Sequence, residues 1–206
     1  MIAIIDYGMG NLRSVEKALV SLGAEVAVTG DPAVVREADG VILPGVGAFG
    51  DAMANLEAQG LVSVIREVVA AGTPFLGICL GMQLLFTTSE EHGEHRGLDL
   101  IPGRVKLFRG DFKIPHIGWN DLKLLQDSVL FDGVENGDYV YWVHSLFVEP
   151  HDRTVLLATT DYYGKVAGIV GQGNVFGIQF HPEKSSRVGL TLLRNFVNLV
   201  REGVRA

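Results

Sequence analysis

Thr73-Pro-Phe-Leu-Gly-Ile-Cys-Leu-Gly-Met-Gln-Leu-Leu-Phe86 is the stretch that decides the fold. Residues 75–78 are an apolar run that predicts a short buried strand, and residues 82–86 predict a helix. The cysteine between them, Cys79, has a glycine two positions before it and another two positions after it. This pattern is typical of a nucleophile elbow, a strained turn with no room for a Cβ atom at the flanking positions. The elbow would hold the sulfur at the carboxyl end of a sheet and beside a helix N-terminus, which favours the reactive thiolate.

Cys79 also has a structural interpretation, because a free cysteine is often only a small buried side chain. It is the single cysteine of the sequence, which excludes an internal disulfide and a zinc site made of several cysteines. The two glycines alone do not decide between the interpretations, so the choice depends on a catalytic partner elsewhere in the chain.

The composition favours one domain over residues 1–206, because a chain of this length with 48% hydrophobic and 20% charged residues can bury a full core. The net charge of −7 argues against a binder of nucleic acid or of anionic membranes. No apolar run reaches the roughly 18 residues of a transmembrane helix. Residues 1–6 lack the basic region of a signal peptide, and together with the single cysteine this predicts a cytoplasmic protein.

Strands and helices alternate along the first half of the chain, which predicts a doubly wound, largely parallel sheet with helices on both faces. The expected strands there are residues 1–6, 24–29, 40–43 and 75–78, and the expected helices are residues 12–22, 31–37, 51–56 and 61–71. After Gly97 the pattern changes to short strands separated by turn residues, which predicts an antiparallel extension of the same sheet. These strands are residues 105–108, 114–117, 121–125, 139–143, 154–160, 167–170 and 175–178, followed by a covering helix at residues 189–200. The expected fold class is therefore α/β, with an open, mixed but largely parallel sheet.

Two other motifs carry less information. Gly8-x-Gly10 is similar to the start of a dinucleotide-binding loop, but Arg13 stands where that loop has its third glycine. His92 and His95 lie in the polar run 90–96, which we interpret as solvated surface. No two histidines have the spacing of a helical metal site. We therefore expect neither a metal nor another cofactor.

Residues 175–183 are predicted to be a strand that ends in His181-Pro-Glu183. Residues two apart in an extended chain face the same way, so the imidazole and the carboxylate can point to one side. The carboxylate would orient the imidazole and stabilise its charged form, while the imidazole would take the proton of a thiol. Cys79, His181 and Glu183 thus supply a nucleophile, a base and an orienting group. The alternative, a strand end with a surface histidine and glutamate, leaves the elbow unexplained.

Gly77-Ile-Cys-Leu-Gly-Met-Gln83 together with His181-Pro-Glu183 resembles the class I, or triad, glutamine amidotransferases. Further stretches are similar to the HisH family, the glutaminase subunits of imidazole glycerol phosphate synthase in histidine biosynthesis. These stretches are Asp6-Tyr-Gly-Met-Gly-Asn-Leu-Arg-Ser14, Leu43-Pro-Gly-Val-Gly-Ala-Phe49, Pro115-His-Ile-Gly-Trp-Asn120 and Tyr141-Trp-Val-His-Ser145. The resemblance spans nearly the whole chain and implies a flavodoxin-like glutaminase fold.

This resemblance implies glutamine hydrolysis without a cofactor. The Cys79 thiolate would attack the side-chain amide of glutamine, His181 would protonate the departing ammonia, and water would release glutamate from the thioester. The oxyanion needs backbone N–H donors, which we expect from Leu80 and from the loop of Val46 and Gly47.

The resemblance also implies that Gly45, Gln83 and Ser145 contact the substrate, with Gln83 at its amino-acid end. Leu146 departs from the family, which commonly has an aromatic residue after the Val-His-Ser run. This difference argues against a side-chain role at position 146 but is compatible with a main-chain contact to glutamine.

In this family the ammonia passes to a (β/α)8-barrel cyclase of the HisF type, so the resemblance implies a heterodimer. Trp119, Tyr141 and His116 are the expected interface residues, because aromatic side chains often anchor such contacts. Trp119 could instead be a core residue. His144 is expected near the thiol, and glutaminase activity is expected to stay low until the cyclase and its ligand turn an oxyanion amide inward.

Three other functions stay open at the level of the sequence. The nearest is a glutaminase subunit of another pathway, such as pyridoxal phosphate or aminobenzoate synthesis. A stand-alone cysteine hydrolase or peptidase on the same fold is disfavoured by the His-Pro-Glu run. A non-catalytic interaction module is disfavoured by the presence of all three triad residues.

Overall fold

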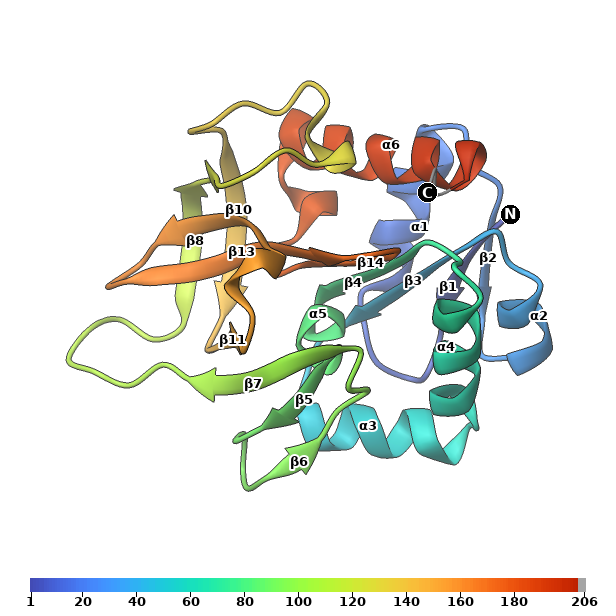
Figure 1. Ribbon diagram of the computed structural model, residues 1–206, viewed down its shortest axis with the longest axis horizontal. Coiled ribbons are helices and arrows are strands. Elements are labelled where there is room, and N and C mark those ends of the chain that lie inside the picture. Colours follow the sequence, from blue (N-terminus) through green and yellow to red (C-terminus); the bar gives the residue numbers. More distant parts are fainter. Residues whose placement is uncertain (204–206) are drawn as a thin grey trace.

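The computed structural model describes residues 1–203 (Figure 1). Within them, the central sheet consists of β2 (Val26–Thr29), β1 (Ile2–Ile5), β3 (Gly40–Gly45), β4 (Phe75–Cys79), β14 (Val175–Ile178), β13 (Lys165–Gln172), β12 (Leu156–Asp161) and β9 (Lys123–Leu124), in this spatial order. From β2 to β14 the neighbours pair in parallel, whereas β13, β12 and β9 pair antiparallel. The predicted mixed, largely parallel sheet with an antiparallel extension is confirmed.

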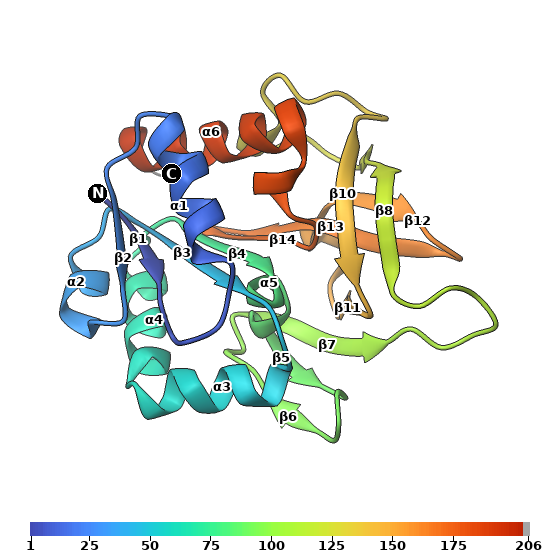
Figure 2. The same ribbon diagram turned by 180° about the vertical axis from the view of Figure 1, so that it is seen from behind.

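Helices cover both faces of this sheet (Figures 1 and 2). One face packs against α1 (Leu12–Ser21) and α6 (Ser186–Glu202), and the other against α2 (Pro32–Arg36), α3 (Phe49–Ala58) and α4 (Leu61–Ala70). Within residues 1–203, no helix combines the length and the apolar character needed to cross a bilayer.

Strand β1 explains why both faces are covered. Its side chains alternate between two hydrophobic cores, Ile2 and Ile4 in the core of α1 and α6, Ala3 and Ile5 in that of α3 and α4. A strand that buries both of its faces reads as a continuous apolar run, as this one does.

The antiparallel part of the chain differs from the prediction of one continuous extension. Two further sheets form beside the main one within residues 1–203. The first pairs β8 (His116–Asp121) with β10 (Tyr139–His144), and the second consists of β11 (Leu146–Pro150), β7 (Ile101–Leu107), β5 (Phe86–Ser89) and β6 (His95–Arg96). The periodicity of a sequence predicts a strand but not its neighbour, so the division into three sheets could not be read from it.

Helix α5 (Leu80–Leu84) begins and ends two residues before the helix predicted over residues 82–86, and Phe86 already begins β5. Cys79 is the last residue of β4 and directly precedes α5, with a φ of 56° and a ψ of −111°, which is a strained conformation for a residue with a Cβ atom. A Cβ on Gly77 would lie 2.5 Å from the carbonyl oxygen of Gly81, and one on Gly81 would lie 1.7 Å from that of Leu43. The predicted elbow is confirmed, and both glycines are needed because backbone passes through the space of their missing side chains.

We expect Gly81→Ala to lower the free energy of unfolding by about 3 kcal/mol or more, because the added methyl group meets a backbone oxygen that cannot move aside. Gly60→Ala is the matched control. Gly60 has a φ of +68° but nothing within 4 Å of an added Cβ, so only the cost of the left-handed backbone, about 1–2 kcal/mol, applies. Urea unfolding measures both values, and equal losses would contradict the close approach at Gly81.

Candidate active site

Three parallel strands bring the site together. Gly45 at the end of β3 pairs with Cys79 at the end of β4, and Ile78 pairs with Ile178 at the end of β14. The carboxyl ends of β3, β4 and β14 therefore meet at one edge of the sheet, where α/β proteins place their ligands. A pocket of about 280 Å³ opens there and is lined by Val46, Gly47, Cys79, Leu80, Gln83, Glu91, Val143, His144, Ser145, Leu146 and His181.

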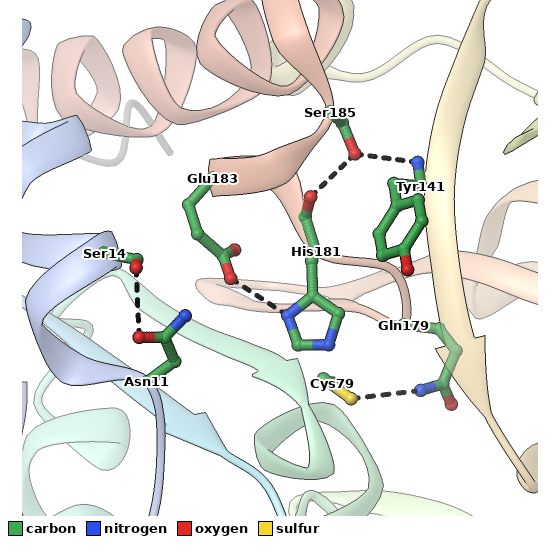
Figure 3. Close-up of polar contacts among 8 residues, drawn as sticks. All are labelled: Asn11, Ser14, Cys79, Tyr141, Gln179, His181, Glu183 and Ser185. Carbon is green, nitrogen blue, oxygen red and sulfur yellow. Dashed lines mark hydrogen bonds and ion pairs between the residues drawn. The ribbon is translucent and has the colours of Figure 1, made fainter. Parts of the chain in front are cut away.

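The structure brings His181 and Glu183 to the sulfur of Cys79. The Nδ1 atom of His181 lies 2.9 Å from Oε1 of Glu183, and both side chains are buried, with 5% and 1% exposed. The ring of His181 lies between Glu183 and Cys79 (Figure 3), and the interaction with Cys79 is one cause of its raised pKa. The expected meeting of these three side chains is thus found, although the local geometry differs. Glu183 lies in a turn of 3-10 helix, Pro182–Lys184, and not on an extended strand.

Ser185 holds the backbone of His181 in place through a hydrogen bond. Its hydroxyl group donates a hydrogen bond to the carbonyl oxygen of His181 over 2.6 Å and accepts one from the N–H of Tyr141 over 2.9 Å (Figure 3). The base is therefore anchored both through its ring and through its main chain, and this anchor ties it to strand β10.

The electrostatics of the site favour a charged imidazole. Burial alone lowers the pKa of His181, but hydrogen bonds to Cys79 and Glu183 and the charges of both groups outweigh it and raise the pKa from 6.5 to about 9. The Oε2 atom of Glu183 is buried without a hydrogen-bond partner within residues 1–203. The imidazole of His181 is thus the group that balances the charge of this carboxylate, which suits a thiolate–imidazolium pair.

The residues expected to supply oxyanion donors all line the pocket. Val46 and Gly47 line the pocket, with Gly47 at a φ of +105°, and Leu80 is the first residue of α5, so its N–H group has no acceptor within the helix. Gly45 lies in β3 just before the loop of Val46 and Gly47, and a Cβ on it would be 2.5 Å from the hydroxyl oxygen of Tyr7. Burial and the charge of Cys79 raise the pKa of Tyr7, whose hydroxyl group donates to the carbonyl of Pro44.

The sequence predicts that residues 90–96 form a solvated loop, and for Glu91 this prediction is wrong. Its side chain lines the pocket, and its Oε2 atom accepts a hydrogen bond of 2.6 Å from the N–H of Phe49, the first residue of α3. The residue before this helix, Ala48, has no side chain that could cap it, so the carboxylate of Glu91 does so from a distant part of the chain. The absence of Ser, Thr, Asp or Asn before α3 was the signal that a cap must come from elsewhere.

Two glutamine side chains lie beside the sulfur. The amide nitrogen of Gln83 donates to Oε1 of Gln179 over 3.1 Å, and the amide nitrogen of Gln179 lies 4.0 Å from the sulfur of Cys79. Gln83 was expected in the pocket, but Gln179 was missed. Its position two residues before His181 was the signal, because the rule that places alternate residues on one side of a strand applies to it as well.

A pair of buried histidines forms the far wall of the pocket. His144 lines it, donates from Nδ1 to the carbonyl of Leu146 over 2.6 Å and lies with Nε2 3.0 Å from Nδ1 of His116. Burial lowers the pKa of both histidines from 6.5 to about 4. His116 is only 3% exposed and stacks on Trp142 and on Tyr162. Its side chain therefore supports the pocket wall from inside, and its predicted place in a partner interface is wrong.

The remaining predicted residues lie where they can contact a ligand or a partner. Ser145 and Leu146 line the pocket. Trp119 is 52% exposed and is not a core residue, and Tyr141 is half-buried beside it. Within residues 1–203, no group of three or more His, Cys, Asp or Glu side chains could hold a metal ion.

This geometry agrees with comparisons to known proteins. The family described as "Glutamine amidotransferase class-I" matches residues 3–199, and the chain belongs to this family. Solved structures agree in fold: a crystal structure of a glutamine amidotransferase has a TM-score of 0.77 at 19% identity and covers 98% of this chain and 100% of that one. PurLQS from Thermotoga maritima has a TM-score of 0.75 at 20% identity and covers 96% and 97%.

Closer relatives narrow the assignment. The chain is 56% identical over 205 residues to "Imidazole glycerol phosphate synthase subunit HisH" from Moorella thermoacetica, which covers 100% of this chain and 98% of the relative. It is 56% identical over 194 residues to the protein of the same name from Aquifex aeolicus, with 94% of each chain covered. The HisH subunits are therefore the branch of the family to which the chain belongs.

We expect the pKa of His181, followed by NMR titration of its imidazole signals, to be about 9. Glu183→Gln should lower it by at least about one unit, because the charge that favours the imidazolium is lost while the burial that disfavours it remains. Glu149→Gln, a change at an exposed carboxylate paired with Lys106, is the control and should have no effect. A pKa that stays near 9 in Glu183→Gln would contradict the role of this carboxylate.

Proposed function

We propose that this chain is the glutaminase subunit of an imidazole glycerol phosphate synthase, with Cys79 as nucleophile, His181 as acid and base, and Glu183 as the group that orients His181. The thiolate of Cys79 attacks the side-chain carbonyl carbon of glutamine, and the carbonyl electrons move to oxygen. The carbonyl re-forms as the C–N bond breaks, so the glutamyl group stays on Cys79 as a thioester and nitrogen leaves as ammonia with the proton of His181. Water gives a proton back to His181 and attacks the thioester, the C–S bond breaks, and glutamate leaves while the thiolate of Cys79 is restored.

One observation carries this proposal. Cys79 and His181 are about a hundred positions apart in the chain, yet the imidazole lies between the sulfur and a buried carboxylate at the mouth of a pocket. A structural cysteine needs no such partner. The relatives named above share more than half of their residues with this chain. Their names favour this subunit over a glutaminase of another pathway or a stand-alone hydrolase.

We assign the residues that line the pocket to different parts of glutamine. The N–H groups of Leu80 and of the loop of Val46 and Gly47 are the donors we assign to the oxyanion, and loss of one such donor typically costs about 10²–10³ in rate. Gly45, Gln83 and Ser145 are assigned to the substrate. Glu91 is an added candidate, because a carboxylate on the pocket wall attracts the α-ammonium group of an amino acid.

The partner is proposed to be a HisF-type barrel cyclase that receives the ammonia in a heterodimer. The sheet of β8 and β10 offers it an apolar face, since Trp119 pairs with Tyr141 and Ile117 with Val143. Ile117, Trp119 and Tyr139 are 47%, 52% and 58% exposed. Val143 also lines the pocket, so a partner on this face lies next to the place where ammonia forms.

The proposed function also bears on the domain organisation and the cellular location of the chain. We infer that residues 1–206 act as one amidotransferase domain, supported by the family match to residues 3–199. A cytoplasmic location stays a prediction of the sequence.

Cys79→Ala should abolish glutamine turnover by the complex while the cyclase still works with added ammonia, because only the nucleophile is removed. The measurement is glutamate release beside cyclase activity with glutamine or with an ammonium salt. Surviving glutamine turnover would refute the nucleophile. Hydrolysis of peptides but not of glutamine by the wild-type chain would favour the stand-alone hydrolase instead.

Trp119→Ala should weaken binding of the cyclase by about 2 kcal/mol, or roughly thirtyfold in Kd, because a large exposed aromatic side chain is a typical interface anchor. Val129→Ala is the control, since Val129 is 58% exposed but lies in the 3-10 turn Val129–Phe131, outside the β8 and β10 sheet. Calorimetric titration with the purified cyclase gives both values. An unchanged Kd for Trp119→Ala would remove this face from the interface.

A further inference from the structure

Gln179 is a buried polar side chain for which the mechanism above has no use. It follows strand β14, has no exposed surface, and its backbone N–H donates to the carbonyl of Gly168. Its side-chain amide connects Gln83 on one side with Cys79 on the other (Figure 3 shows the contact to the sulfur). A buried amide costs free energy unless its donors and acceptors are used, so these two contacts are the reason it can be there.

The two amides can point in either of two directions, and the direction decides which form of the sulfur they favour. If Gln83 donates to Oε1 of Gln179, the amide nitrogen of Gln179 faces the sulfur and can donate to a thiolate. If both amides are turned over, Oε1 of Gln179 faces the sulfur and can only accept from a protonated thiol. The structure has the first direction, with the amide nitrogen of Gln83 3.1 Å from Oε1 of Gln179 and the amide nitrogen of Gln179 4.0 Å from the sulfur.

We propose that Gln83 and Gln179 form a directed amide relay that stabilises the thiolate of Cys79. Gln179 is the catalytic residue of the relay because it touches the reacting sulfur, and Gln83 is a positioning residue that keeps the donor side of Gln179 turned toward it. This role deepens the proposed function, since the thiolate is the nucleophile that attacks glutamine.

The surroundings of the sulfur make such a donor useful. Cys79 is 8% exposed, so water does little to solvate a negative charge there. His181 meets the sulfur with a positive charge, and Gln179 adds a dipole that points its positive end at the same atom. A hydrogen bond to a charged group is about twice as strong as one between neutral groups, so we expect loss of this donor to lower the fraction of thiolate about tenfold.

Gln83 connects this relay to the pocket. Its amide nitrogen is used by Gln179, which leaves its Oε1 able to accept a hydrogen bond from a ligand in the pocket that Gln83 lines. A substrate group that donates to this oxygen holds Gln83, and through it Gln179, in the direction that serves the thiolate. Substrate binding and activation of the nucleophile are thereby joined by two hydrogen bonds.

The test uses the single cysteine of the chain, because alkylation by iodoacetamide then reports only on Cys79. The rate is measured near pH 7 and near pH 10 for wild type, Gln179→Met, Gln83→Met and the control Gln172→Met. Methionine has a similar volume but cannot donate a hydrogen bond, and Gln172 is an exposed residue at the end of β13. Thermal unfolding of each variant monitors the fold.

We expect Gln179→Met to slow alkylation near pH 7 about tenfold and Gln83→Met about threefold, with Gln172→Met unchanged. Near pH 10 the thiol ionises in every variant, so the rates should come together. A rate for Gln179→Met equal to that of Gln172→Met near pH 7 would overturn the relay. An equal loss at both pH values would also overturn it, because it would mean altered access to the sulfur and not altered ionisation. Glutamine turnover plays no part in this readout, so a failure of the proposed function is seen separately, in glutamate release.

Discussion

The close approach of helix α5 to the end of strand β3 is the constraint on which the site depends. The backbone of Gly81 lies so near the carbonyl of Leu43 that a Cβ atom there would be 1.7 Å from the oxygen. The chain turns sharply beside this contact, and Cys79, two residues before Gly81, has a φ of 56°. The strain has a use, because it points the sulfur away from the sheet and into the pocket while the first N–H groups of α5 face the same space.

The same edge of the sheet brings distant residues together. Strand β14 arrives beside β4 in parallel, so the residues that follow it reach the sulfur from the other side. Gln179 and His181 both come from this segment, and Ser185 ties it to β10. The third contributor, β3, leads directly into the loop of Val46 and Gly47. The pocket thus depends on the register of three strands, and few of its contacts are local.

Whether the sequence predicts a feature depends on how far apart along the chain the interacting residues lie. The glycines on either side of Cys79 and the His-Pro-Glu run are both local patterns, so the elbow and the base could be predicted, although Gly81 makes its tightest contact with the distant Leu43. The burial of His116 depends on stacking with Trp142 and Tyr162, and the role of Glu91 depends on helix α3 lying 42 positions earlier. Such contacts follow from packing of whole elements, which no local pattern contains. Gln179 was missed although its position two residues before His181 is a local signal, because alternate residues of an extended chain face the same side.

His181 and His144 line the same pocket as Cys79 but differ in their protonation, and their partners explain the difference. His181 has the carboxylate of Glu183 and the sulfur beside it, and its pKa rises to about 9. His144 is buried, and the charges of His116 and His181 also disfavour its protonation, so its pKa falls to about 4 although Leu146 accepts from its ring. At neutral pH one imidazole is charged and the other is not. A second imidazolium would compete for the thiolate and would raise the cost of charging His181. The neutral histidine pair therefore leaves His181 as the charged imidazole beside the sulfur, which suits its proposed role as the acid that protonates the departing ammonia.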